Sequence, residues 1–555
     1  MSKYGLKIKI YQAGSVYEAD RGVRTYYDAR DAMLCNSLFL DFIKDNGLNI
    51  YKEESTRDII CVEFKYGASS YEEARKKLVA KMADAPDEKL PYYKERLEAI
   101  AKIEPQFDKK SKEDLRTLFY EEGLNIRYGE DEVVHYRMLY RTPGKAKKGS
   151  VMFIRDELYP VAREFLYMGY ELPQENAPIV EVGAYSSLIT STIEARICIL
   201  PENILIISDF KSFMRTNVVS IETDEERRCH AVPREDYELC NTMFDGQALI
   251  DESIFPEWAN GYVLLRQHFT KCAAFCTRIQ LFFKDYFGKD YESAEVVDFF
   301  GNKHAAKDVR LITTTEAVKW LKFPSITYDH WCERVRANGS MWGVVKTAHQ
   351  SKLGDVQRMS YQMVNALRPE IMDDVSLRTR DYIYRLKTED ATFLEYLEHN
   401  RNFSNDYDVM AAICRENPEF VCSEYFRDRK ERIIGSYMKN MKLGRLIQNA
   451  DNLVIVGSPY AMLLHAVGED PESDPTFERE AEATQCWTER FKADEYLAAF
   501  RSPLNSQNNV DYLHNVYHEY FTKYFDLGRL IIAVNMNHTG FQSRNNGSDQ
   551  ILVAS

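Results

Sequence analysis

Residues 530–536 read LIIAVNM, a continuous apolar run of strand length, and this stretch decides the fold. A run of this kind, bounded by turn-forming residues, predicts a buried strand. Upstream, residues 501–503 read RSP, a turn signal, and we expect a helix near residues 511–525. Downstream, residues 545–550 read NNGSDQ, a polar loop with one carboxylate, Asp549. The end of the chain therefore predicts a turn, a crossing helix, a buried strand and an acidic loop.

The whole chain has 555 residues, too many for one core, and its length suggests three or four domains. With 45% hydrophobic and 28% charged residues, it has the composition of a globular protein. No apolar run is long enough for a membrane helix, and the N-terminus lacks the apolar core of a signal peptide. There are eleven cysteines but no Cys-x-x-Cys, and Cys272 and Cys276 have no matching second pair. We therefore expect a cytoplasmic, reducing setting without structural zinc.

The formal net charge of −14 argues against adhesion to nucleic acid over the whole surface. It leaves room for a local basic channel, so the local charge pattern is the better guide.

Five regions follow from the pattern of apolar and turn residues, and together they predict an α+β multidomain fold. Residues 1–150 are mixed α/β, with a capping box at Ser70–Glu73 and a helix over 74–82. Residues 151–240 are β-rich, with short β-branched runs at 177–182, 195–200, 204–207 and 218–223. Residues 241–370 continue as strands, with a Gly301-Asn302 hairpin turn and a helix-like stretch at 315–322. Residues 371–450 form a helical connector, with helices at 390–397 and 407–415, and residues 451–555 return to strands.

Two segments with lysines could carry chemistry. Asp245-Gly246 begins an apolar run, and residues 261–271 follow with Arg266 and Lys271. Residues 316–323 read EAVKWLKF and carry Lys319 and Lys322, of which Lys322, before Phe323, is the preferred candidate. A point cation beside a triphosphate neutralises the charge that builds up on its phosphates. The alternative for each lysine alone is an exposed helix end.

Two further segments reverse the acidic balance of the chain. Residues 346–362 combine Lys346, Lys352 and Arg358 with several amides, a mixture suited to phosphate and sugar contacts. Residues 427–445 hold seven cations against two acids: Arg427, Arg429, Lys430, Arg432, Lys439, Lys442 and Arg445. Their alternation with apolar residues predicts an amphipathic helix with a basic face for nucleic acid. A solvated helix face without a ligand is the alternative in both segments.

Two weaker signals complete the survey. The basic stretch 141–149 reads RTPGKAKKG, either an interdomain loop or a contact to phosphates. His514 and His518 are four residues apart, which fits a helix pair better than a metal site.

The order of these segments resembles that of single-chain RNA polymerases with two double-psi β-barrels, over roughly residues 240–550. The similar proteins are the RNA-dependent RNA polymerases of RNA silencing and their phage and mobile-element relatives. The resemblance implies that residues 241–370 form the first barrel, with Lys271 and Lys322 as catalytic lysines. It also implies substrate contacts for Asp245, Arg266 and Arg501, and a metal-binding role for Asp549.

The same resemblance implies template-directed RNA synthesis from nucleoside triphosphates, with Mg²⁺ as cofactor and nucleic acid as partner. The family's loop supplies three aspartates for two metal ions. Here only Asp549 is present, with Ile551 and Val553 at the other two places. Loss of two carboxylates cripples Mg²⁺ binding, so we expect no catalysis by this chain alone.

Two interpretations of function stay open. In one, the chain is the N-terminal portion of a polymerase whose second barrel, 451–555, is incomplete, and a second polypeptide supplies the rest. We then expect residues 451–555 alone to fold poorly, because an open edge at residues 531–534 invites aggregation. In the other, the protein is a non-catalytic nucleic-acid-binding or interaction module on the same scaffold. A multidomain protein unrelated to polymerases is a third, less specific alternative.

Overall fold

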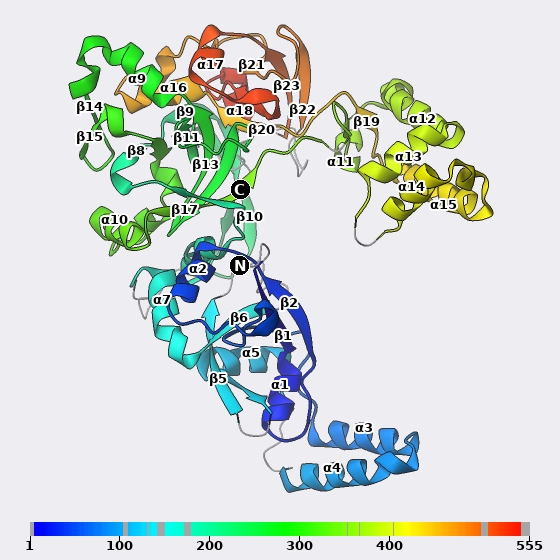
Figure 1. The fold of residues 1–555 in the computed structure, drawn as a ribbon. Helices are drawn as coiled ribbons and strands as arrows, with labels where there is room; N and C mark the ends of the chain where they lie inside the picture. Colours follow the sequence, from blue (N-terminus) through cyan, green and yellow to red (C-terminus); the bar gives the residue numbers. More distant parts are fainter. Residues whose placement is uncertain are drawn as a thin grey trace. The chain divides into compact units, whose positions relative to one another are not determined.

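The computed structural model describes residues 5–103, 109–129, 132–140, 150–170, 179–351, 353–365, 367–402, 405–500 and 509–544. The chain divides into two compact units. The first unit comprises residues 1–204, 264–272 and 315–346, and the second comprises 205–263, 273–314 and 347–555. The expected α+β class is confirmed: helices and several curled, half-barrel sheets alternate along the chain (Figure 1).

The first unit is built on a six-stranded sheet of order β2-β1-β3-β6-β5-β4. β1 and β3 are parallel, and the other neighbours are antiparallel. The strands are β1 (Leu6–Gln12), β2 (Ala29–Leu34), β3 (Ile59–Glu63), β4 (Leu124–Tyr128), β5 (Glu132–Tyr140) and β6 (Ser150–Arg155).

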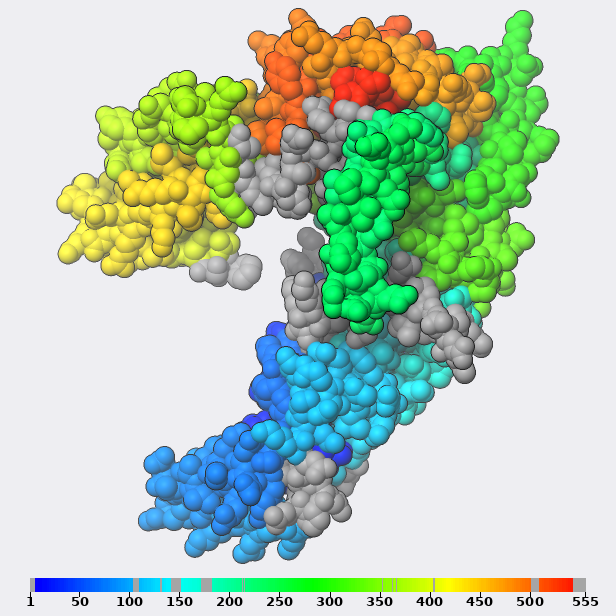
Figure 2. All heavy atoms as spheres, turned by 180° about the vertical axis from the view of Figure 1, so that it is seen from behind, coloured from blue at the N-terminus to red at the C-terminus, as the bar shows by residue number. Residues whose placement is uncertain are grey.

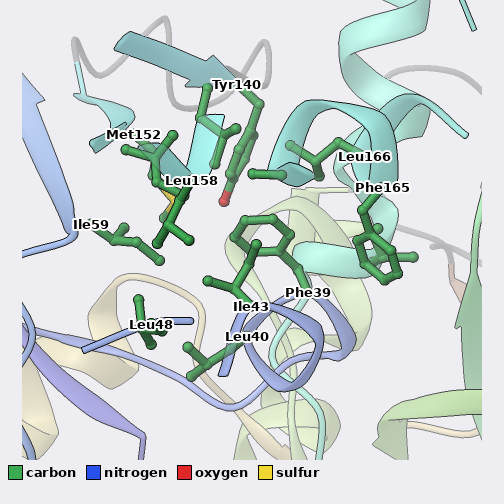
Figure 3. Close-up of a cluster of buried hydrophobic side chains, with 14 of the residues drawn as sticks. Phe39, Leu40, Ile43, Leu48, Ile59, Tyr140, Met152, Leu158, Phe165 and Leu166 are labelled. Carbon is green, nitrogen blue, oxygen red and sulfur yellow. The ribbon is translucent and has the colours of Figure 1, made fainter. Parts of the chain in front are cut away.

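Both faces of this sheet are packed against helices. Alternate residues of a strand point to opposite faces, and Met152 and Ile154 of β6 join one apolar cluster while Val151 and Phe153 join another. The first cluster includes side chains of α2 (Leu38–Asp45) and α7 (Tyr159–Tyr167), as Figure 3 shows. The second includes side chains of α1 (Ala13–Asp20) and α5 (Lys112–Glu121).

Two expectations for this unit have different outcomes. The capping box at Ser70 and Glu73 is confirmed: it begins α3 (Tyr71–Ala83), which contacts α4 (Leu90–Ile103). The strand expected at 177–182 is wrong, because residues from Ile179 onward form α8 (Ile179–Ser186). A short apolar run does not by itself distinguish a buried helix from a strand.

A seven-stranded sheet has the order β7-β17-β12-β13-β11-β16-β8. Its strands are β7 (Ala195–Cys198), β8 (Ile204–Ile207), β11 (Gln247–Asp251), β12 (Tyr262–Gln267), β13 (Thr270–Thr277), β16 (Leu311–Thr314) and β17 (Met341–Thr347). The expected strands near 195–200 and 204–207 are thereby confirmed. β11 and β13 are parallel, and both are buried along nearly their whole length.

The second unit contains a five-stranded sheet of order β20-β24-β21-β23-β22. The strands are β20 (Val454–Gly457), β21 (Thr484–Trp487), β22 (Tyr496–Phe500), β23 (Val510–Asn515) and β24 (Ile531–Val534). The apolar run at residues 530–536 therefore contains a strand, β24, as expected. The open edge expected there is wrong, because β24 lies between β20, to which it is parallel, and β21, to which it is antiparallel.

The helix expected near 511–525 is only partly correct. Its first half is β23, and a shorter helix, α17 (Glu519–Tyr524), follows. The alternation of buried and exposed residues along β23 has the period of a strand. His514 consequently lies on a strand and His518 at the N-cap of α17, so the expected helix pair is wrong.

Two hairpins extend from the second unit. β9 (Lys211–Thr223) and β10 (Cys229–Thr242) form a long antiparallel ribbon, which Figure 2 shows as a narrow ridge of green atoms. The run expected at 218–223 belongs to this ribbon. β14 (Glu295–Val297) and β15 (Lys303–Ala305) confirm the hairpin around Gly301, whose positive φ of 85° suits glycine.

The described residues of 371–450 are mainly helical, as expected, with four α-helices around one apolar cluster. They are α12 (Met372–Thr388), α13 (Asp390–His399), α14 (Tyr407–Glu416) and α15 (Glu424–Lys442). The remaining helices and strands are short connections: α9 (Ile279–Phe287), α10 (Tyr328–Ala337), β18 (Gln357–Arg358), α11 (Tyr361–Asn365), β19 (Ile447–Gln448), α16 (Pro459–Ala466) and α18 (Thr539–Arg544). In the described parts of the chain, no helix is both long and apolar enough to cross a membrane.

Candidate functional site

The two lysine segments predicted from the sequence lie side by side in the first unit. Thr270 forms an antiparallel bridge with Val318, and the amide of Lys319 donates to the carbonyl oxygen of Phe269 at 2.7 Å. The rings of Phe269 and Phe323 pack edge to face, with centroids 5.5 Å apart. Lys271 therefore lies on a strand whose first residues contact the segment that carries Lys319 and Lys322.

Arg266 and Lys271, which lie in one segment of the sequence, belong to two different strands. β12 stops at Gln267, and Lys271 is the second residue of β13. A tight turn at His268-Phe269 separates the two strands, and Phe269 has a positive φ of 48°. Arg266 is buried within β12, with 9% of its surface exposed.

Hydrogen bonds of the buried residue His268 hold this turn in place. Its Nε2 lies 2.9 Å from the carbonyl oxygen of Phe165, and its own carbonyl accepts from the indole of Trp331 at 3.2 Å. Complete burial lowers the pKa of His268 to about 4, so the ring is neutral near pH 7. The turn before Lys271 is thus held by a buried neutral histidine that the sequence patterns did not single out.

The two lysines of the second segment differ in their contacts. The ammonium of Lys319 donates to the carbonyl oxygen of Glu316 in its own turn. Lys322 is exposed and donates to the hydroxyl of Tyr185 at 3.2 Å, with Nζ 5.4 Å from the centre of that ring. Because the Lys322 ammonium lies at the surface beside a hydroxyl, an anionic ligand can reach it with little rearrangement.

In the second unit, the Asp245-Gly246 turn is held by an aspartate that sequence reasoning missed. The carboxylate of Asp209 accepts from the amide of Phe244 at 3.0 Å and from that of Asp245 at 2.8 Å. Asp245 and Gly246 both have positive φ, 25° and 77°. The only hint of this role in the sequence is that Asp209 closely follows the apolar run of β8.

Gln247 links this turn to the second sheet of the unit. Its side-chain amide donates to the carbonyl of Gly457 at 2.9 Å, and its carbonyl oxygen accepts from the amide of Gly457 at 2.8 Å. Gln247 is fully buried. A side chain thereby makes the pair of hydrogen bonds that a neighbouring strand would make.

The end of β24 and the residues that follow it contact the part of the second unit that contains Gln247 and Gly457. The amide of Ser458 donates to Val534 at 3.0 Å, and a Cβ on Gly457 would meet Cγ of Met536 at 2.6 Å. The side chain of Gln542 in α18 donates to the carbonyl of Met536 at 3.2 Å. The Asp-Gly turn, the end of β20 and the strand that leads toward residue 545 therefore meet in one buried cluster.

Three predicted site residues, Lys352, Arg501 and Asp549, lie outside the described residues. Among the described residues, no group of three His, Cys, Asp or Glu side chains is arranged to hold a metal ion. The donor set that the sequence offers near residue 549 is one carboxylate with neutral amides and a hydroxyl, which does not fit a pair of Mg²⁺ ions.

The predicted basic segments are placed as follows. Lys346 is exposed near the end of β17. Arg358 was expected on a helix but lies on β18, because the chain turns into the short α11 only at Tyr361. The guanidinium carbon of Arg358 lies 5.2 Å from the ring centre of Tyr437.

The amphipathic helix expected at 427–445 is α15, whose buried residues are Phe426, Ile433, Ile434 and Tyr437. Two of its predicted nucleic-acid-binding cations form ion pairs within the helical segment. Arg429 pairs with Asp406 at 2.6 Å, and Lys430 pairs with Asp390 at 2.7 Å. The other five cations are exposed: Arg427, Arg432, Lys439, Lys442 and Arg445.

No family model matches the chain, and no curated protein matches it either.

Proposed function

We propose that this protein binds nucleoside triphosphates and nucleic acid on the scaffold of a two-barrel, template-directed RNA polymerase. The observation that carries the proposal is the contact between the Lys271 and Lys319–Lys322 segments. They are separated by more than forty residues in the sequence, and the resemblance to two-barrel polymerases predicts a shared role for them.

In this proposal the lysines act as cations for the triphosphate. Lys322 offers an exposed ammonium beside the Tyr185 hydroxyl, and Lys271 is partly exposed at the start of β13. An ammonium is a compact point charge that neutralises phosphate oxygens without fixing their geometry. No step through Mg²⁺ is derived, because the available donor set does not fit the metal pair.

The double-psi form of the barrels belongs to the same proposal. Its support is the parallel pair β11 and β13 in one sheet and the parallel pair β20 and β24 in the other. The Gln247–Gly457 contact joins the start of β11 to the end of β20.

A second candidate is a nucleic-acid-binding module without catalysis. The exposed cations of α15 favour it, because a basic helix face binds phosphates regardless of sequence. The two candidates differ in whether the lysines of the first unit matter for ligand binding.

The test is equilibrium binding of a fluorescent ATP analogue to the full chain, with and without Lys271→Gln and Lys322→Gln together. We expect the double variant to weaken binding about tenfold or more, since two charge-assisted contacts are lost. Lys289→Gln, an exposed lysine beside α9, is the matched control and should bind like the wild type.

Binding of a single-stranded RNA oligonucleotide to the same variants separates the candidates. If ATP binding is absent or unaffected by the lysine changes while RNA binding is lost in an Arg432→Gln, Lys439→Gln variant, the polymerase proposal is wrong and the second candidate holds.

A further inference from the structure

The first unit contains a pocket of about 390 Å³ where three stretches of chain meet. They are the end of α1 with the turn after it, the loop after β3 with the first turns of α3, and the residues just before α5. Four of the lining side chains are cations and two are carboxylates: Arg24, Lys77, Lys109 and Lys110, against Glu18 and Glu73. In a chain with a formal net charge of −14, this pocket reverses the overall charge locally.

Backbone contacts bring residues 109–111 to the loop after β3. The amide of Ala68 donates to the carbonyl oxygen of Lys110 at 2.9 Å, and the two residues form an isolated antiparallel bridge. A Cβ on Gly67 would lie 2.0 Å from the same oxygen, so a side chain at this position would prevent the approach. The glycine thus allows two distant stretches of sequence to place their lysines around one pocket.

Both carboxylates of the pocket are already paired with a cation. Glu18 accepts from the amide of Ser69 at 2.9 Å and pairs with Arg24 at 3.3 Å. Glu73, in the first turn of α3, pairs with Lys109 at 2.9 Å. Two of the four cations are therefore balanced within the pocket.

The other two cations, Lys77 and Lys110, form no ion pair with any described residue. The ammonium of Lys77 donates to the hydroxyl of Ser69 at 3.0 Å, which uses one of its three N–H donors. Lys77 is exposed and Lys110 is half-buried, and both line the pocket, so a ligand can reach them from solvent. The pocket therefore has two accessible cations with donors to spare.

This arrangement favours a compact anion with about two negative charges and several acceptor oxygens. Two ammoniums that line one pocket repel each other, and an anion between them removes that repulsion. A phosphate group has both properties, and lysine binds it as a point charge. α3 and α5 also begin beside the pocket, but their capping boxes are complete, so the lysines rather than the helix ends carry the argument.

We propose that this pocket binds a phosphate group, either free or on a small molecule, with Lys77 and Lys110 as its principal cations. The hydroxyls of Ser69 and Ser111 also line the pocket, and each keeps a proton to donate to a phosphate oxygen. The proposal goes beyond the nucleotide function, because it uses none of the residues assigned to that function.

The first test is titration of inorganic phosphate into the full chain at low ionic strength, followed by ³¹P NMR. We expect saturable binding, and a Lys77→Gln, Lys110→Gln variant should weaken it about tenfold or more, since two charge-assisted contacts are lost. Lys94→Gln, Lys102→Gln removes the same charge from exposed positions of α4 and should bind like the wild type. Glycerol 3-phosphate is titrated in the same way. Tighter binding than that of phosphate assigns the site to a monoester, and equal binding assigns it to free phosphate.

The second test changes the charge in the opposite direction. Glu73→Gln removes a negative charge from the pocket and releases the ammonium of Lys109, while glutamine can still complete the capping box of α3. Phosphate binding should therefore strengthen about two- to fivefold. Glu95→Gln, exposed on α4, is the matched control. A variant that had only lost its fold could not gain affinity.

Four results overturn the proposal. Equal binding in the lysine variant and its control overturns the site, and unchanged binding in Glu73→Gln overturns its electrostatic basis. If phosphate binding is lost only in Lys271→Gln, Lys322→Gln, the phosphate belongs to the nucleotide site. If Lys77 and Lys110 matter for a single-stranded RNA oligonucleotide but not for phosphate, the occupant is nucleic acid.

Discussion

The six-stranded sheet of the first unit and the five-stranded sheet of the second differ in how their faces are covered. The first is packed on both faces, with helices contributing to an apolar cluster on each side. The second presents apolar side chains of four strands to a cavity of about 640 Å³. A fully packed sheet serves as a scaffold, whereas a sheet with an unfilled face has room for a ligand. Of these two sheets, the second has space beside one of its faces.

A leucine-to-alanine change at each sheet tests this contrast most directly, with one leucine in the cluster packed on the first sheet and the other within the second sheet. Leu166→Ala removes a fully buried side chain from the first cluster (Figure 3) and should cost about 3–4 kcal/mol of unfolding free energy. Leu497→Ala, in the cavity lining and only partly buried, should cost only about 1–2 kcal/mol, because part of its surface is already exposed and loses no packed neighbour. Urea unfolding of the two variants measures both values. Equal costs would mean that the second sheet is packed as tightly as the first.

Acidification should destabilise the first unit through His268. The folded pKa of His268 is about 4, below the ordinary value of 6.5, because burial disfavours the charged ring. As pH falls from about 6.5 to about 4, the unfolded chain binds a proton that the folded chain does not, so stability falls, by roughly 3 kcal/mol at most. Urea unfolding at pH 7.5 and pH 4.5 measures the loss. His268→Gln should flatten this dependence, and an unchanged slope in that variant would contradict the assignment to His268.

The smallest expected effect lies in the helical segment of the second unit. The hydrogen bond from Arg429 holds the pKa of Asp406 below its ordinary range. A carboxyl with a lowered folded pKa stabilises the protein above its unfolded pKa, about 4, and this contribution is lost as pH falls through the folded pKa. The pair is about one-third exposed, so Arg429→Gln should cost only about 0.5 kcal/mol at pH 7, and less below pH 4. Unfolding at pH 7 and pH 3 checks this, with Arg427→Gln on the same helix as the neutral control.

Local patterns predicted the elements whose signals are local. The capping box of α3, the hairpin at Gly301, the helices α13 and α14 and the strand β24 all follow from spacing within a few residues. The proximity of the two lysine segments was predicted from the order of motifs along the chain. It was not predicted from the spacing of residues within either segment. The failures have a common physical cause: α8 and β23 are stretches where a helical or extended backbone suits the local residues about equally, and tertiary packing decides.

Sequence patterns could not predict the residues whose hydrogen bonds hold the candidate site. Asp209 and Gln247 are single polar residues whose roles depend on amides brought to them by other strands. The interior position of β24 likewise depends on pairing with β20 and β21, which no property of residues 530–536 reveals. Arg358 was expected on a helix because residues 357–362 resemble the helix that leaves the first barrel of the silencing polymerases, but its pairing with β19 makes it part of a strand.

The contact between Gln247 and Gly457 spans 210 positions of sequence. A ribosome completes residue 247 long before residue 457 leaves the exit tunnel, and synthesis proceeds at about 5–20 residues per second. During that interval of at least about ten seconds, the side-chain amide of Gln247 lacks the two backbone partners that it has in the folded chain, although β11 can already pair with β13 and β16. The junction between β11 and β20 is therefore among the last parts of the second unit to become native during synthesis.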